Sequence, residues 1–126
     1  MNKTAFEIHV YRVWDNKRKN AFERGIEFDL SLISVRNMLR AKRCYYTGIP
    51  LTHRKLDKNG KVLPGQRNKP NHMTIERIDA TKGYVKGNVV ACSLQANKVK
   101  SVFENPSSLL KVEHFCKMVR KMEKRK

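Results

Sequence analysis

The chain is 126 residues long and carries 28 Lys and Arg residues against 11 Asp and Glu residues, which gives a formal net charge of +17. Its hydrophobic content of 40% is enough for one modest core and argues against a disordered chain, so we expect a single domain over residues 1–126. So large an excess of one charge favours a polyanionic partner, and nucleic acid is the expected one.

The apolar segments and the cysteines indicate in which cellular compartment the protein is expected. No apolar run approaches the roughly 20 residues of a membrane-spanning helix, and the first residues lack the hydrophobic region of a signal peptide. We therefore expect a cytoplasmic protein with no membrane partner. Cys44, Cys92 and Cys116 are an odd and widely spaced set, which predicts buried free thiols rather than a disulfide framework.

The first 42 residues predict a helical N-terminal lobe. A helix over about 4–24 would bury one apolar stripe and end at Gly25. After a short extended segment, Ser31 or Asp29 is placed to cap a second helix that runs through about Lys42. The expected inward residues are Phe6, Val10, Val13, Trp14, Ala21 and Phe22 of the first helix, and Leu32, Val35, Met38 and Leu39 of the second.

Residues 43–71 change character. The segment 43–52, RCYYTGIPLT, has aromatic residues, a Gly and a Pro, which predict a tight hairpin-like turn. From 53 to 71 the chain is polar and rich in turn residues, which predicts an exposed basic loop.

The next stretch predicts strand, loop, strand and helix. Alternation over 73–78 predicts a strand that presents Thr74 and Glu76 on one face and Arg77 on the other. A Gly-containing loop follows over 79–87, and then a second strand over 88–92. A helix begins near Leu94, capped by Ser93. These residues complete a central unit over 43–103.

The C-terminal segment, 104–126, predicts a helix that begins at Asn105-Pro106 and ends in a basic tail. Its apolar residues are expected to complete the core, which would leave little for dimerisation through this helix. The chain is thus expected to be a monomer or a homodimer. The expected core residues are Leu109, Leu110, Val112, Phe115, Cys116 and Val119.

The central unit can build a small metal site. The end of the first strand and the first turn of the following helix can face each other, and they carry Glu76 and Asn97. A carboxylate and an amide oxygen can together hold one hard cation and leave positions open for water and phosphate oxygens. In the alternative reading, Glu76 pairs with a neighbouring Lys and Asn97 bonds to a loop.

Residues 43–52 and 72–101 resemble the HNH endonucleases of the His-Me finger (ββα-metal) superfamily, especially small enzymes of phages and mobile elements. In that family an acidic residue and a His end the first strand, an Asn follows in the loop or second strand, and a His or Asn lies on the helix. Glu76-Arg77, Asn88 and Asn97 fall at those places, eleven and nine residues apart. The loop KGYVKGNV is also similar.

The resemblance implies an α+β fold with a ββα-metal core and flanking N- and C-terminal helices. It implies that Glu76 and Asn97 bind Mg²⁺ or Mn²⁺ and that Asn88 braces the loop through backbone hydrogen bonds. It also implies hydrolysis of phosphodiester bonds in DNA, with duplex DNA as partner and the cytoplasm of a bacterial host as location if the chain is phage-encoded.

The chain departs from the family at the general base. The family's His is replaced by Arg77, whose always-charged guanidinium is a poor base but a good phosphate clamp. His72 lies four residues before Glu76 on the same strand face, about 13 Å away along an ideal strand, and is a candidate substitute; otherwise it is an exposed histidine in a turn. Asp79 is another candidate base, or else a turn-capping residue.

The chain also departs from the family at the structural zinc, which many relatives hold with two Cys-x-x-Cys knuckles. The first knuckle reads Cys44-Tyr45-Tyr46-Thr47 and the second reads Ser93-Leu94-Gln95-Ala96. Three of the four thiolates are missing, so no structural zinc is expected.

Two functions follow. The leading expectation is a divalent-metal-dependent DNA endonuclease or nickase, and the alternative is a catalytically inactive HNH-like DNA-binding protein. RNA is the weaker partner, because no aromatic-rich RNA-binding motif is present. Basic residues near the site elements are expected to contact phosphates, although each one singly is equally a solvated surface charge. They are Arg40, Lys42, Arg43, Lys82, Lys86, Lys98 and Lys100.

Overall fold

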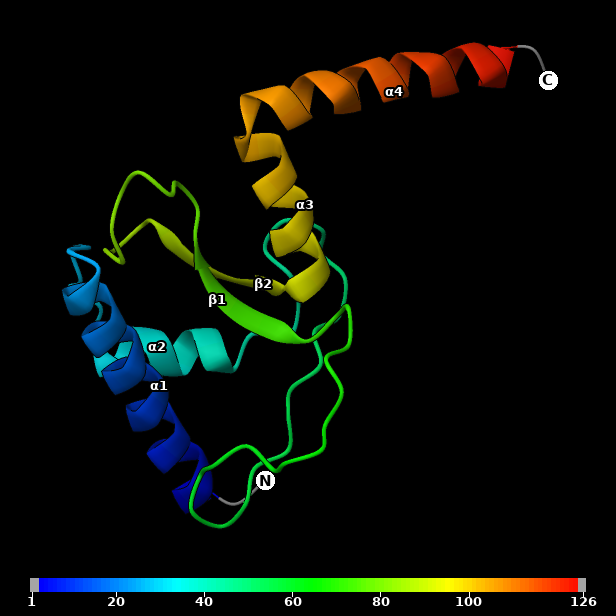
Figure 1. The fold of residues 1–126 in the computed structure, drawn as a ribbon. Coiled ribbons are helices and arrows are strands. Elements are labelled where there is room, and N and C mark those ends of the chain that lie inside the picture. Colours follow the sequence, from blue (N-terminus) through cyan, green and yellow to red (C-terminus); the bar gives the residue numbers. More distant parts are fainter. Residues whose placement is uncertain (1–2, 125–126) are drawn as a thin grey trace.

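The computed structural model describes residues 3–124, in which four helices accompany a two-stranded antiparallel sheet. This arrangement confirms the expected α+β class (Figure 1). In chain order the elements are α1 (Lys3–Glu23), α2 (Leu32–Leu39), β1 (Met73–Arg77), β2 (Val89–Ser93), α3 (Leu94–Glu104) and α4 (Pro106–Lys124).

The two N-terminal helices form as expected, with differences at their edges. Gly25 lies two residues after the end of α1 and adopts a φ of 66°, a left-handed conformation that follows a helix end at little cost for glycine. The Ser31 side chain caps α2 by accepting a hydrogen bond from the Ser34 N–H. The expectation that α2 reaches Lys42 is wrong, because the Arg40 and Ala41 N–H groups bond three residues back and tighten the chain out of the helix.

For two residues of the N-terminal helices, the expectation of burial in the core is wrong. Phe22 is 86% exposed and Leu32 is 43% exposed. Phe22 follows the fully buried Ala21, and adjacent helical residues point about 100° apart, so burying one turns the other outward.

Two apolar clusters hold the body together and meet at the sheet. One joins α1 and α2 to β1 through residues such as Val10, Val35 and Ile75. The other cluster joins β2 and α3 to the turn that follows α2, through residues such as Cys44, Cys92 and Ala96. The sheet is therefore covered by the N-terminal helices through one cluster and by α3 through the other.

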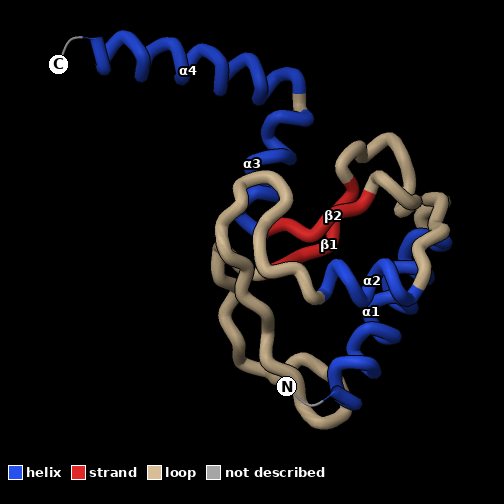
Figure 2. The backbone as a smooth tube through the Cα atoms, turned by 180° about the vertical axis from the view of Figure 1, so that it is seen from behind, coloured by secondary structure: helices blue, strands red, loops and turns tan. Residues whose placement is uncertain are grey.

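The turn and loop between α2 and β1 are only partly as expected. The hairpin-like turn is confirmed by a bridge between Arg43 and Pro50. The loop over 53–71 is more than an exposed segment, since it returns to the N-terminal end of α1 (Figure 2). There Gly60 is buried, so close to Ala5 and His9 of α1 that a Cβ atom would lie 2.6 Å from the Ala5 carbonyl oxygen.

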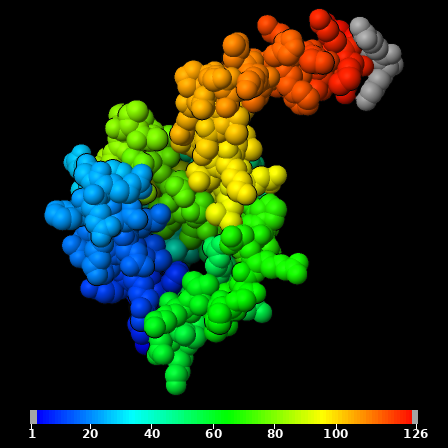
Figure 3. Space-filling view, in the orientation of Figure 1, coloured from blue at the N-terminus to red at the C-terminus, as the bar shows by residue number. Residues whose placement is uncertain are grey.

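The last helix projects away from the body. None of the described residues of α4 is buried, so the expectation that its apolar stripe completes the core is wrong (Figures 1 and 3). The cause is the break at Asn105, whose extended backbone ends α3 and lets Pro106 start a helix in a new direction. Cys116 is exposed as a result, whereas Cys44 and Cys92 are buried free thiols.

None of the helices within residues 3–124 is long and apolar enough to cross a membrane.

Candidate active site

The pairing of the two strands fixes which side chains share a face with Glu76. Thr74 lies opposite Cys92 and Glu76 lies opposite Val90, so all four point to one side of the sheet. On that side the Thr74 hydroxyl donates a hydrogen bond of 2.8 Å to Glu76 Oε1. The expectation that Thr74 and Glu76 share a face is confirmed.

Helix α3 covers this face and carries Asn97. Ser93 ends β2 and caps α3 by accepting a 3.1 Å hydrogen bond from the Ala96 N–H, which fixes where the helix starts. Ala96 then packs in one cluster with Cys92. Asn97 follows directly and is half-buried. The helix turn with Asn97 is thus placed over the strand face with Glu76.

Neither side chain has the partner that the alternative reading requires. Within residues 3–124 no ion pair involves Glu76, although the chain carries 28 basic residues. Over the same range the Asn97 side-chain amide makes no hydrogen bond, and its backbone carbonyl accepts from Ser101 instead. Both oxygen donors thus remain available to a ligand.

The loop between the strands is braced by Asn88. This side chain is only 7% exposed and accepts a hydrogen bond of 2.9 Å from the Asp79 N–H. Its amide nitrogen donates to the carbonyls of Asp79 and Gly83, at 3.1 and 2.8 Å. These bonds confirm the bracing expected of Asn88; its part in catalysis stays a prediction.

Arg77 braces the same loop from the strand end. Its Nη1 donates to the carbonyls of Ala80 and Lys82, at 2.9 and 3.0 Å, and its guanidinium lies 5.3 Å from the centre of the Tyr84 ring. Alternation along β1 turns it away from the Glu76 face. Its remaining donors are still suited to a phosphate, and that contact stays a prediction.

His72 is not the exposed turn residue considered above. It is 4% exposed, and its Nε2 lies 3.1 Å from the Arg67 carbonyl, which can only accept. Nε2 is therefore the donor to this carbonyl, and Nδ1 shares a hydrogen bond of 2.7 Å with the Thr52 hydroxyl. With both nitrogens engaged inside the protein, His72 is poorly placed to take a proton from water.

Asp79 is also a weak candidate base. Its Oδ1 accepts hydrogen bonds from the Thr81 hydroxyl and N–H, at 2.6 and 2.9 Å. These bonds lower the pKa of Asp79, so the carboxylate holds protons poorly at neutral pH. The geometry matches the turn-capping alternative.

Hard oxygen ligands define which cation suits this site. Within residues 3–124 no three His, Cys, Asp or Glu side chains gather in one place, which leaves one carboxylate and one amide at Glu76 and Asn97. Mg²⁺ commonly keeps several waters and uses one or two carboxylates together with substrate phosphates. The donor set fits Mg²⁺ or Mn²⁺ bound with substrate better than it fits zinc.

The positions of the two knuckles meet in space although most of their thiols are missing. Cys44 Sγ lies 3.4 Å from the Ser93 N–H, which donates to it. Burial raises the pKa of the Cys44 thiol, but hydrogen bonds from Thr47, Ser93 and Tyr46 outweigh burial and bring the pKa down to about 7. Burial raises the pKa of Cys92 to about 12. The absence of structural zinc stays a prediction.

The basic residues expected to contact phosphate are mostly solvent-facing. All are exposed except Lys100, which is half-buried and pairs with Glu104. Lys82 of the loop between the strands and Lys100 of α3 both act electrostatically on Asp79. The loop and α3 therefore both place positive charge near Asp79. Two of these basic side chains contact other parts of the protein. Arg43 donates a hydrogen bond to the Gly48 carbonyl, and the Arg40 guanidinium lies over the Phe6 ring.

Sequence reasoning missed the contacts that hold the loop from the N-terminal side. The Tyr84 N–H donates to the Glu27 carbonyl at 2.8 Å, and Asp29 accepts from the Lys86 N–H at 3.1 Å. Gly83 gives one signal, because a Cβ atom there would lie 2.4 Å from the Glu27 carbonyl oxygen. The other partners lie more than fifty residues apart in the chain, beyond the reach of local patterns.

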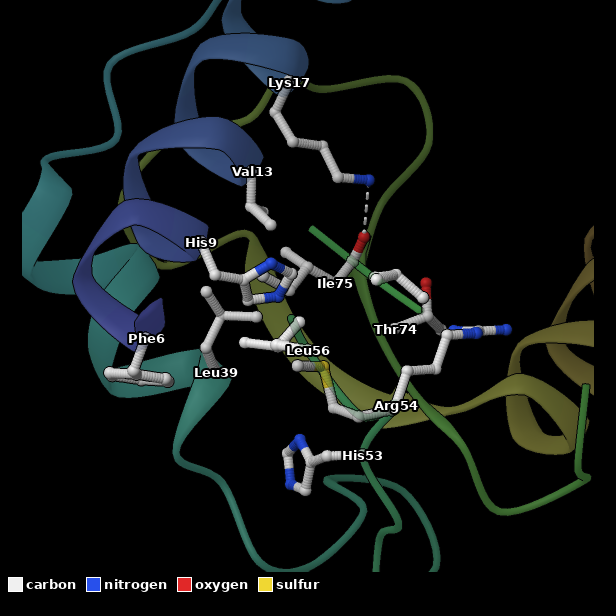
Figure 4. Close-up of a pocket in the computed structure, with 12 residues that line it drawn as sticks. Phe6, His9, Val13, Lys17, Leu39, His53, Arg54, Leu56, Thr74 and Ile75 are labelled. Atoms are coloured by element: carbon white, nitrogen blue, oxygen red, sulfur yellow. Dashed lines mark hydrogen bonds between the residues drawn. The ribbon is translucent and has the colours of Figure 1, made fainter. Parts of the chain in front are cut away.

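A separate cavity of about 190 Å³ lies beside β1 (Figure 4). Lys17 from α1 lines it and donates to the Ile75 carbonyl at 3.1 Å. Histidines from α1 and the long loop, His9 and His53, also line it. Neither Glu76 nor Asn97 lines this cavity, although Thr74, which bonds to Glu76, does.

The chain has limited similarity to known proteins. No protein-family model matches it, and no solved structure matches it. It is 28% identical over 92 residues to an uncharacterized 29.0 kDa protein in the dda-modA intergenic region of Enterobacteria phage T4. The match covers 73% of this chain and 32% of that protein, so the chain spans about a third of the length of its phage relative.

Proposed function

We propose that this protein is a divalent-metal-dependent DNA endonuclease or nickase that hydrolyses phosphodiester bonds. In this proposal β1, β2 and α3 form a ββα-metal core. The observation that carries the proposal is the state of Glu76, a half-buried carboxylate beneath α3 that has no cationic partner among residues 3–124 of a chain with a net charge of +17. A carboxylate kept free of lysine and arginine in so basic a protein is available for a metal cation.

Each residue has a defined task in this proposal. Glu76 and Asn97 hold Mg²⁺ or Mn²⁺, and the Thr74 hydroxyl fixes the orientation of the carboxylate. The bound ion would supply Lewis-acid activation of the phosphate and of the attacking water. Asn88 and Arg77 hold the loop that joins the strands.

In this proposal, exposed basic side chains around the site bind the phosphates of the DNA. Lys82 from the loop and Lys98 from α3 are exposed and suited to neutralise backbone phosphates of duplex DNA. Such contacts give affinity rather than sequence choice. RNA is the weaker partner. Similarity to a phage protein supports, within this proposal, a role in the cytoplasm of a bacterial host.

The proposal is tested by nicking of a supercoiled plasmid at low salt with Mg²⁺ and with Mn²⁺. Glu76→Ala and Asn97→Ala should each lower the nicking rate about a hundredfold or more, because each removes a metal ligand. Gln95→Ala, on the exposed side of the same helix, is the matched control and should nick as the unaltered protein does. DNA binding, measured alongside, should persist in all three variants.

A second function is favoured by the groups around Glu76. Arg77 occupies the position of the family's base, both nitrogens of His72 are engaged, and hydrogen bonds lower the pKa of Asp79. A scaffold that retained its charge but lost its base would be a DNA-binding protein without catalytic activity. Tight DNA binding with no nicking under either metal would establish this alternative and reject the endonuclease.

A further inference from the structure

An apolar groove lies between α3 and the turn that follows α2. It has a volume of about 390 Å³, within the range of roughly 300–1,000 Å³ that is typical of small-ligand sites. Its apolar walls are Tyr46 and Ile49 from the turn and Val99 and Phe103 from α3 (Figure 1). These side chains are between 38% and 49% exposed. The groove is therefore open to a ligand that arrives from solvent.

The turn holds its wall of the groove in a fixed position. The Tyr45 N–H donates to the Ala91 carbonyl of β2 at 3.0 Å. Within the turn, the Cys44 N–H donates to the Ile49 carbonyl at 2.9 Å. The Tyr45 ring lies edge-on to the Tyr46 ring, with 5.2 Å between their centres. The aromatic wall is thus formed before a ligand binds, which lowers the entropic cost of binding.

The groove adjoins the strand face that carries Glu76. Burial raises the pKa of Tyr46, and the Glu76 carboxylate is among the nearby groups that raise it further. Lys100 lines the groove and acts electrostatically on Cys92, on which the Glu76 carboxylate acts as well. Both Tyr46 and Lys100 therefore lie near the Glu76 face. A DNA strand with one phosphate at Glu76 can reach the groove with an adjacent base.

The chemistry of the groove selects its occupant. Among residues 3–124 no acidic side chain lines it, whereas Lys100 does. Lys100 pairs with Glu104, but an ammonium has three donors and keeps others for a phosphate oxygen. A nucleotide supplies a flat base, which stacks on aromatic side chains, and a phosphate, which pairs with a cation. A second copy of the chain would instead bring a further net charge of +17 to this surface.

We propose that this groove binds one unstacked nucleobase of the DNA, next to the phosphate at the Glu76 site. The groove acts within the proposed function, on which this inference rests, and it defines the substrate further as DNA with a nucleotide that is unpaired or turned out of the helix. Turning a base out of a paired duplex costs free energy, and an already unpaired nucleotide avoids most of that cost. DNA with a bulged nucleotide should therefore bind more tightly than fully paired DNA.

The base contact is tested with three duplexes that share one sequence. One carries a single bulged thymidine, the second carries an abasic bulge at the same place, and the third is fully paired. The first two have the same phosphates and differ only in the base, so the ratio of their affinities measures the contact with that base. Fluorescence anisotropy without a divalent metal ion should show the bulged thymidine bound at least about fivefold more tightly than the abasic bulge.

Single substitutions locate the base on the protein. Tyr46→Ala and Phe103→Ala should each remove most of the preference for the thymidine bulge, because each removes an aromatic wall. Tyr46→Phe keeps the ring and should keep the preference. Tyr11→Ala is the matched control, since Tyr11 is a 54% exposed tyrosine of α1 that does not line the groove, and it should leave the preference unchanged. Circular dichroism checks that each variant is folded.

Two results would overturn the groove proposal and leave the endonuclease proposal standing. In the first, the unaltered protein binds all three duplexes without a preference for the base. In the second, the preference withstands both Tyr46→Ala and Phe103→Ala, which would place the base elsewhere. A dimer in sedimentation that is lost in Phe103→Ala, together with no base preference, would assign the groove to a second copy of the chain.

Nicking of the same duplexes with Mg²⁺ separates the two proposals. A base preference without nicking would reject the endonuclease and keep the groove as part of a DNA-binding protein. No binding to any of the three duplexes would reject both.

Discussion

At the scale of single residues, the candidate site is a half-buried carboxylate held in place by a neighbouring hydroxyl. The Thr74–Glu76 hydrogen bond of 2.8 Å fixes one carboxylate oxygen, and α3 limits access to the face on which both lie. Loss of water around Glu76 strengthens its attraction for any cation that enters. In the proposed function, the metal binds on this strand face and the surrounding polar residues support it.

Asn88 is the support residue whose loss should cost most. Asn88→Ala would leave the Asp79 N–H and the Asp79 and Gly83 carbonyls without their partner, so we expect the free energy of unfolding to fall by about 2–4 kcal/mol. Urea unfolding measures this change. Asn37→Ala, at an exposed position on α2, is the control and should change stability little. Equal effects of the two substitutions would show that Asn88 does not brace the loop.

Cys44 should link stability to pH. Its folded pKa of about 7 lies below the ordinary value of 9.0, so folding favours the thiolate. Its contribution to stability should be fully present above about pH 9 and should be lost as pH falls through about 7. Urea unfolding under reducing conditions should show a steeper rise in stability between these pH values for the unaltered protein than for Cys44→Ser. Parallel curves would show that the thiol is not ionised in the folded state.

Local patterns located the strand–loop–strand–helix unit well, and they missed what depends on distant partners. The strands and α3 begin within one residue of expectation, because alternation and the Ser93 cap are local signals. Burial of His72 depends on Thr52 and Arg67, whose approach no short window contains. For the same reason, the availability of the Glu76 carboxylate became visible only in the structure.

At the scale of elements, the long loop and α4 show that a hydrophobic pattern does not by itself predict which segments pack against the body of the protein. The loop over 53–71 has few apolar residues but packs through Gly60 against α1. α4 has a clear apolar stripe, but none of its described residues is buried. A stripe predicts that a helix has a face to cover and leaves open which molecule covers it.

Gly60 should be the residue that docks the loop. Gly60→Ala would set a Cβ atom 2.6 Å from the Ala5 carbonyl oxygen and 2.8 Å from the His9 nitrogen, both of which belong to the backbone of α1. Gly65 has a similar φ of 80°, against 75° for Gly60, but its Cβ would meet nothing within 4 Å. Gly60→Ala should therefore destabilise the fold by about 1–3 kcal/mol more than Gly65→Ala does in thermal or urea unfolding. A smaller loss for Gly60→Ala than for Gly65→Ala would show that the loop does not dock as described.

At the scale of the whole molecule, the net charge of +17 should dominate the affinity for DNA. Each phosphate contact on duplex DNA adds about 0.9 to the slope of log affinity against log salt. The slope therefore counts the contacts, whichever of the two proposed functions is right.

Lys82 should be one of those contacts. Lys82→Ala should lower the salt slope by about 0.9, measured by fluorescence anisotropy on a duplex. Lys58→Ala removes the same charge from the long loop and should leave the slope nearly unchanged, because that loop lies toward the N-terminal end of α1. Equal slopes for the two variants would place the DNA elsewhere on the surface.

The endonuclease proposal depends above all on the sharing of one divalent cation by Glu76 and Asn97. Its most direct test is binding of Mn²⁺, followed by electron paramagnetic resonance, in the unaltered protein, in Glu76→Gln and in Asn97→Ala, each with a duplex oligonucleotide present. We expect one bound ion in the unaltered protein and an affinity at least about tenfold weaker in each variant. Equal Mn²⁺ binding in all three proteins, or no binding in any of them, would contradict it.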